Sequence, residues 1–119
     1  MTKTITTEKL TPEQIEEKRL ELQKQLGTEV VAGCVEDSKG NQIVGYIKHP
    51  SFEYKMKALD KSAQSFTGAS KMLLEGNLIK EASDPRILDE QYENGKVKLS
   101  FMTICSNLCG IYEDTLKKK

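Results

Sequence analysis

The chain has 119 residues, which is the size of one ordinary domain and leaves no room for a second independent core. Hydrophobic residues make up 37% of it and charged residues 30%, so we expect a modest core with a solvated segment outside it. The 18 basic residues balance the 18 acidic ones, and this balance argues against a surface for nucleic acid or for an anionic membrane.

The sequence has neither a secretory signal nor a membrane-spanning pattern. Its first ten residues, MTKTITTEKL, are polar, and no apolar run approaches the roughly 20 residues that span a bilayer. The three cysteines are odd in number, which fits a reducing compartment. We therefore expect a cytoplasmic protein that does not bind a membrane.

The first predicted helix begins at the tetrapeptide Thr-Pro-Glu-Gln (11–14). It offers a hydroxyl for the N-cap, a proline for the first helical position and a glutamine that completes a capping box. The helix should end at Leu26, before Gly27. Its apolar stripe is narrow and consists of Ile15, Leu22 and Leu26.

Two interpretations of this helix remain open. In the first it packs loosely on its own domain, and in the second it is a mobile arm that docks on a partner or a sister subunit through Ile15, Leu22 and Leu26. We divide the chain into an N-terminal helical arm, residues 1–27, and a single α+β domain, residues 28–119. Because the stripe is narrow, we expect the arm to be removable without unfolding the domain.

A β-hairpin is predicted next, because the runs EVVAGCVE and QIVGYI are rich in β-branched residues and flank the polar segment 37–41. Gly40 suits the turn, while Gly33 and Gly45 inside the strands indicate a bulge or a close neighbour. Pro50 should end the second strand.

Helices are predicted for most of the remaining chain. Ser51 caps the first of them, and a second follows over 69–80 although Gly76 near its middle lowers helix propensity. The helix that begins after Ser51 has an apolar face that we assign to the core: Phe52, Met56, Leu59 and Ala63.

The strongest helical pattern lies at the C-terminal end of the sequence. A short helix capped by Asp84 should end before Gly95. A long amphipathic helix should follow, with a length of about 30 Å at a rise of 1.5 Å per residue. The predicted fold class is therefore α+β and mainly helical, with the arm, one hairpin and three to four helices. The apolar positions of the last helix are Val97, Phe101, Ile104, Cys105, Leu108, Ile111, Tyr112 and Leu116.

The sequence gives no pattern for catalysis. It has no phosphate-binding glycine loop, no Cys-x-x-Cys pair, no His-Glu-x-x-His and no nucleophile with a recognisable base. We interpret the aspartates at 37, 60, 84 and 89 as turn, surface or capping residues. His49, the single histidine, should be a surface or turn residue. We therefore predict a protein that is not an enzyme and that works by binding other proteins.

A metal or other cofactor is not expected either. Cys105 and Cys109 are four residues apart on a predicted helix and in principle face one metal together, but His49 is far away in sequence. The sequence therefore offers few soft ligands for a metal site. We interpret these cysteines as small apolar core residues.

Two segments carry a resemblance to a known family. They are GYIKHPSFEYKMKALDKS and LSFMTICSNLCGIYEDTLKKK, and together with the order of elements from Val30 to Lys119 they resemble the tail assembly chaperones of long-tailed bacteriophages. The resemblance implies an assembly factor in the cytoplasm of the host bacterium. Such a factor binds the tape measure protein, helps tail-tube subunits to polymerise around it, and self-associates. Residues 1–27 have no counterpart in the family.

Two alternatives stay open beside this one. The first is a small structural or connector component of a phage virion. The second is a regulatory protein that binds a host factor.

Overall fold

The computed structural model describes residues 9–110. The mainly helical α+β class is confirmed, with one two-stranded antiparallel sheet in this part of the chain. The elements in chain order are α1 (Pro12–Leu26), β1 (Val30–Glu36), β2 (Gln42–Lys48), α2 (Phe52–Ser62), α3 (Phe66–Asn77), the 3₁₀ helices η1 (Pro85–Leu88) and η2 (Tyr92–Gly95), and α4 (Lys96–Cys109).

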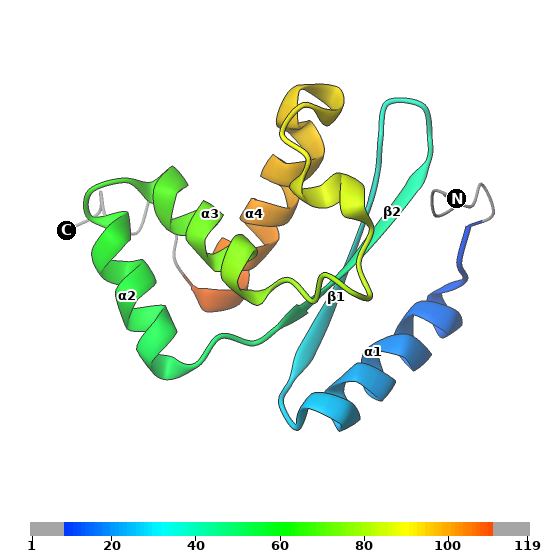
Figure 1. Ribbon diagram of the computed structural model, residues 1–119, viewed down its shortest axis with the longest axis horizontal. Coiled ribbons are helices and arrows are strands. Elements are labelled where there is room, and N and C mark those ends of the chain that lie inside the picture. The colour runs from blue at the N-terminus through cyan, green and yellow to red at the C-terminus, as the bar shows by residue number, and fades with distance from the viewer. Residues whose placement is uncertain (1–8, 111–119) are drawn as a thin grey trace.

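The hairpin lies in the middle of the molecule, with α1 on one face and α4 and η1 on the other (Figure 1). Its register is continuous from the pair Val30 and Lys48 to the pair Glu36 and Gln42, so neither strand contains a bulge. Because side chains alternate between the faces of a strand, the two faces contribute to two separate hydrophobic clusters.

Helix α1 begins and ends as its sequence indicates. The Thr11 hydroxyl accepts from the Gln14 backbone N–H at 3.1 Å, and the Gln14 side chain accepts from the Thr11 N–H at 2.8 Å. Gly27 closes the helix in the left-handed region, with φ of 69°. The side of α1 that carries Leu22 packs on the hairpin, in a cluster with Val30, Val44 and Tyr46.

A close neighbour explains why both strands contain a glycine. Gly33 and Gly45 are directly opposite each other, and the fully buried Phe101 ring of α4 lies against both. A Cβ at Gly45 would lie 2.5 Å from Ile87 Cδ1 and 2.8 Å from Phe101 Cε2. Side chains at these positions would therefore push α4 away from the sheet.

Gly76 has a similar reason to be glycine in the last turns of α3. A Cβ there would lie 1.9 Å from the Tyr54 hydroxyl oxygen. That hydroxyl donates to the Met72 carbonyl at 2.8 Å, which holds α2 against α3. The loss of helix propensity at Gly76 therefore accompanies close packing of the two helices.

A buried lysine links α3 to α4. The Lys98 ammonium lies 2.7 Å from Glu75 and 2.7 Å from Glu90. Burial alone would lower the pKa of Lys98, but the two carboxylates together raise it above its usual value. Close to the other end of α4, the Ser70 and Ser106 hydroxyls are hydrogen-bonded to each other.

Several predicted boundaries were wrong. Helix α3 ends at Asn77 and not near residue 80, and the short helix after Asp84 is two 3₁₀ turns. Helix α4 ends at Cys109 because Gly110 takes a left-handed conformation, with φ of 71°. The predicted continuation through Ile111, Tyr112 and Leu116 lies outside the described residues.

The contact between Phe101 and the strand glycines gives a first prediction. Gly45→Ala should lower the free energy of unfolding by about 1–3 kcal/mol, the usual cost of overpacking a core. Where the backbone conformation and the available space tolerate alanine, a change from glycine to alanine instead raises the free energy of unfolding by about 0.4–1 kcal/mol, because it restricts the unfolded chain. The sign of the measured change therefore shows whether Phe101 and Ile87 crowd this position. Urea denaturation measures it. Cys34→Ala, at an exposed strand position, is the control, and a Gly45→Ala protein as stable as the wild type would contradict this packing.

The packing of α1 gives a second prediction. Leu22 is 6% exposed and Leu26 is 48% exposed, although both belong to the same apolar stripe. Leu22→Ala should destabilise the protein by about 2–3 kcal/mol, and Leu26→Ala by less than about 1 kcal/mol. Thermal and urea denaturation of both variants give the comparison. Similar small effects at both positions would mean that α1 is not part of the folded domain.

Candidate protein interaction surface

Helix α2 presents its apolar face to solvent. Phe52 is 74% exposed, Met56 51% and Leu59 53%, and their spacing of four and three residues places them on one side of the helix. The spacing of these residues predicted that the face belongs to the core, and that prediction was wrong. We name these three side chains the α2 apolar face.

The opposite side of α2 is the buried one. Ala58 is fully buried and Ser62 nearly so, and Tyr54 lies on the same side, where it reaches the backbone of α3. Small residues permit close approach of two helices, whereas the larger Phe52 and Leu59 point away. The hydrophobic pattern therefore predicted burial of the wrong face, because the face that is buried consists of an alanine, a serine and a hydrogen-bonding tyrosine.

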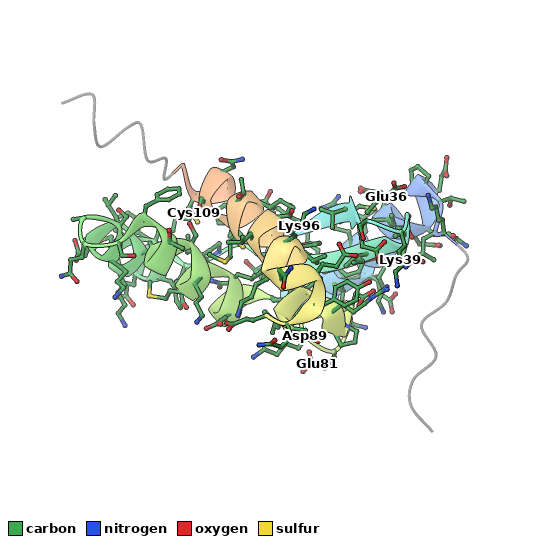
Figure 2. The ribbon with its side chains drawn as sticks, turned by 90° about the horizontal axis from the view of Figure 1, so that it is seen from above. Glu36, Lys39, Glu81, Asp89, Lys96 and Cys109 are labelled. Atoms are coloured by element: carbon green, nitrogen blue, oxygen red, sulfur yellow. The ribbon has the colours of Figure 1, made fainter. Side chains whose placement is uncertain are left out.

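Among residues 9–110, no element covers this face, because of the position of α2 in the fold. The helix packs chiefly on α3 and lies at the end of the molecule opposite the hairpin turn (Figure 2). Its N-terminus is held by Ser51, whose hydroxyl accepts from the Tyr54 N–H at 3.2 Å. The face is therefore presented on a capped, ordered helix.

Charges of both signs surround the α2 apolar face. Glu53, Lys57 and Asp60 are exposed on the same helix. Lys55 lies near Cys109 at the end of α4. A border of mixed sign does not select a strongly charged partner, so recognition here depends on shape and apolar contact.

The three residues proposed from sequence as a partner-binding stripe are not exposed together. Leu22 is buried against the hairpin and Ile15 is partly buried at the margin of the same cluster. Leu26, at the end of α1, is half-exposed. Of the two interpretations, the structure matches the helix that packs on its own domain.

Other exposed apolar side chains are scattered. Leu10 precedes α1, Leu20 lies on the outer side of α1, and Leu99 lies on α4. Single exposed leucines of this kind are normal on soluble proteins, whereas three large apolar side chains on one helix face are a common mark of an interface. Within residues 9–110, the α2 apolar face is thus the best candidate for a functional site.

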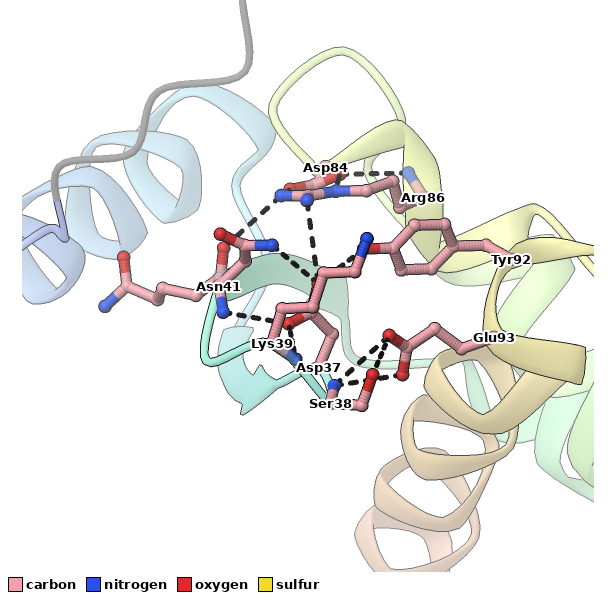
Figure 3. Close-up of polar contacts among 9 residues, drawn as sticks. Asp37, Ser38, Lys39, Asn41, Asp84, Arg86, Tyr92 and Glu93 are labelled. Carbon is pink, nitrogen blue, oxygen red and sulfur yellow. Dashed lines mark hydrogen bonds and ion pairs between the residues drawn. The ribbon is translucent and has the colours of Figure 1, made fainter.

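A cluster of polar and charged side chains lies at the hairpin turn (Figure 3). The buried Asp37 carboxylate accepts hydrogen bonds from the Tyr92 hydroxyl, from the Asn41 amide at 2.9 Å and from the backbone N–H groups of Lys39 and Asn41 (Figure 3). The Tyr92 hydrogen bond makes the largest contribution to a pKa of Asp37 far below its usual range, and it outweighs the opposing effect of burial.

The rest of this cluster is also internally partnered. Arg86 binds both oxygens of Asp84, at 3.0 and 2.7 Å, and its guanidinium lies 5.6 Å from the centre of the Tyr92 ring. The Glu93 carboxylate accepts from the Ser38 N–H and hydroxyl. The carboxylates of Asp37, Asp84 and Glu93 and the Arg86 guanidinium thus all have partners within the protein, so these groups join the hairpin turn to η1 and η2.

His49 lies at the end of β2 and has a neighbour that sequence reasoning missed. Its Nδ1 is 3.6 Å from Glu29 Oε1 and has no hydrogen-bond partner. The pairing follows from the hairpin register, because the His49 N–H donates to the Glu29 carbonyl at 2.8 Å. The register was the available signal, since it places residues 29 and 49 opposite each other.

The cysteines of α4 are poor candidates for chemistry. Burial raises the pKa of the Cys105 thiol to about 12 and also raises the pKa of Cys109 above its usual value. Both thiols are therefore neutral near pH 7, when nucleophiles and metal ligands need the thiolate. Between residues 9 and 110, no group of three or more His, Cys, Asp or Glu side chains is arranged to hold a metal ion.

Comparisons with known proteins give no relative. No family model, no curated protein and no solved structure matches the chain. In the part that the structure describes, no helix is both long and apolar enough to cross a membrane.

The Asp37 hydrogen bonds predict how stability depends on pH. The pKa of Asp37 is lower in the folded protein than in the unfolded chain, so the unfolded state binds the proton more readily. The contribution of the ionised Asp37 to the free energy of unfolding is complete above about pH 5 and is lost progressively as the pH falls through 4 and below. Urea denaturation between about pH 3 and pH 7 should show this loss in the wild type and a shallower dependence in Asp37→Asn. Parallel pH profiles for the two proteins would contradict it.

Proposed function

We propose that this protein is a non-catalytic assembly factor that binds a helical client protein through the α2 apolar face. The observation that carries the proposal is the exposure of Phe52, Met56 and Leu59 on one side of an ordered helix. An amphipathic helix is the partner that such a face suits, because apolar side chains at spacings of three and four residues interdigitate with the same spacing on another helix.

The pattern-level resemblance to phage tail assembly chaperones gives this client a chemical identity. In that family the client is the tape measure protein, a long helical chain on which tail-tube subunits assemble. A small protein with no net charge and an exposed apolar helix face suits such a role, since one apolar site on each of many copies can shield a long apolar client. Tape measure and tail-tube proteins are therefore the proposed partners, in the cytoplasm of the host bacterium.

The test compares two sets of exposed residues. The site variant carries Phe52→Ser, Met56→Ser and Leu59→Ser, and the matched control carries Leu20→Ser and Leu99→Ser, which alter exposed leucines on α1 and α4. Loss of three apolar contacts should weaken binding of a tape measure helical segment by about a hundredfold or more, measured by isothermal titration calorimetry. The control should bind within about twofold of the wild type.

The possible results separate the proposal from its alternatives. Equal affinity of the site variant and the wild type would remove the α2 apolar face from the proposal. Failure of the wild type to bind any tape measure segment would reject the chaperone function. Mass spectrometry of purified particles distinguishes a transient factor, which is absent from them, from a structural or connector component, which is present. A host protein recovered as the sole specific partner would instead favour a regulatory role.

A further inference from the structure

The charged side chains beside the α2 apolar face are separated by sign. In the heptad notation abcdefg, Phe52 and Leu59 occupy d positions of α2 and Met56 occupies the a position between them. Glu53 and Asp60 directly follow the two d residues, so they occupy e positions on one side of the face. Both side chains are exposed. This side of the face is therefore acidic and open to solvent.

The opposite side of the face carries a lysine. Lys55 directly precedes Met56 and occupies a g position, and it is partly buried near Cys109 at the end of α4. The next g position is Ser62, which is buried. The g side of the α2 apolar face is therefore basic and adjoins the body of the domain.

The two acidic side chains have no ionic partner in the described part of the chain. Within residues 9–110, no ion pair joins Glu53 or Asp60 to another residue. In contrast, the exposed Glu16 lies 2.6 Å from Arg19 on α1. Neither Glu53 nor Asp60 therefore has to give up an internal ion pair in order to meet a partner.

The two carboxylates are spaced to face one side of a second helix. Glu53 and Asp60 are seven residues apart, which is about two turns, or about 10 Å at a rise of 1.5 Å per residue. A helix that packs along α2 at the shallow angle of a coiled coil repeats its own flanking positions at the same interval. Lysines or arginines seven residues apart on that helix would meet both carboxylates.

We propose that the α2 apolar face accepts an amphipathic helix whose apolar stripe is bordered on one side by basic residues, which lie over Glu53 and Asp60. This inference rests on the proposed function, because it describes the client helix of the same face. The separation of signs constrains where the client carries its charge and not its net charge. Charges beside an apolar helix interface set the choice and the direction of the partner. The basic side of the client therefore decides in which direction it runs along α2.

The experiment uses the full-length protein and two designed two-heptad peptides of identical composition. Both carry leucine at a and d, and a lactam bridge between b and f keeps each peptide helical. The first has lysine at e and glutamine at g, and the second has glutamine at e and lysine at g. A spin label at the peptide N-terminus broadens the NMR signals of nearby amides, so it reports which end of α2 lies beside the N-terminus of the peptide.

The two peptides should bind in opposite directions. In an antiparallel helix pair e positions meet e positions, whereas in a parallel pair g positions meet e positions. The first peptide should therefore bind antiparallel and broaden the amides of Leu59 and Asp60, and the second should bind parallel and broaden those of Phe52 and Glu53. Each direction should be favoured at least about fivefold, the effect of two exposed ion pairs.

Two variants identify the residues responsible for the direction. Glu53→Gln with Asp60→Asn removes both charges at nearly constant size, so both peptides should still bind but without a preferred direction. The matched control, Glu17→Gln with Glu81→Gln, removes two exposed charges on α1 and on the segment after α3. It should keep the preference of the wild type.

Three results would overturn the proposal. If each peptide broadens both ends of α2 equally in the wild type, the face binds helices without selecting their charge, and the proposed function stands without this refinement. If the preference persists after Glu53→Gln with Asp60→Asn, other residues select the direction. If neither peptide affects the α2 signals, the α2 apolar face does not bind helices, and the proposed function loses its binding surface as well.

Discussion

The contact on which the rest of the fold depends is the stacking of Phe101 on two glycines of the hairpin. Gly33 and Gly45 are paired across the strands, and together they leave room for an aromatic ring where side chains would otherwise stand. This contact places α4 directly on the sheet. Helix α4 in turn contacts α3 through the Ser70–Ser106 hydrogen bond and the Lys98–Glu75 ion pair, so α4 and α3 are arranged in succession outwards from the hairpin.

The same arrangement of elements explains why α2 exposes apolar residues. Helix α2 is attached chiefly to α3, through a face of small residues and the hydroxyl of Tyr54. Nothing else in the described part of the chain packs over Phe52, Met56 and Leu59. A surface of this kind lowers solubility unless a partner covers it, so its presence on a well-capped helix favours a role in binding.

Much of the architecture could be predicted from sequence, because it depends on local signals. The capping box at Thr11, the hairpin turn at Gly40 and the helix start at Ser51 each act within a few residues of the chain. The exposed face of α2 could not be predicted, because burial there is decided by α3. A pattern of spacing shows that Phe52, Met56 and Leu59 share a face but not whether another element covers it. Likewise, the two strand glycines indicated a close neighbour without identifying Phe101 as that neighbour.

If the α2 apolar face binds a partner protein, a crosslinker placed on that face should capture the partner in the cell. Site-specific photo-crosslinking from residue 56 tests it most directly, with a photoreactive amino acid in place of Met56 and, in a parallel strain, in place of the equally exposed Leu99. We expect a single discrete adduct from position 56, with the cross-linked peptide in an amphipathic helical segment of the partner, and no such adduct from position 99. Absence of an adduct at position 56, or the same adducts from both positions, would contradict it.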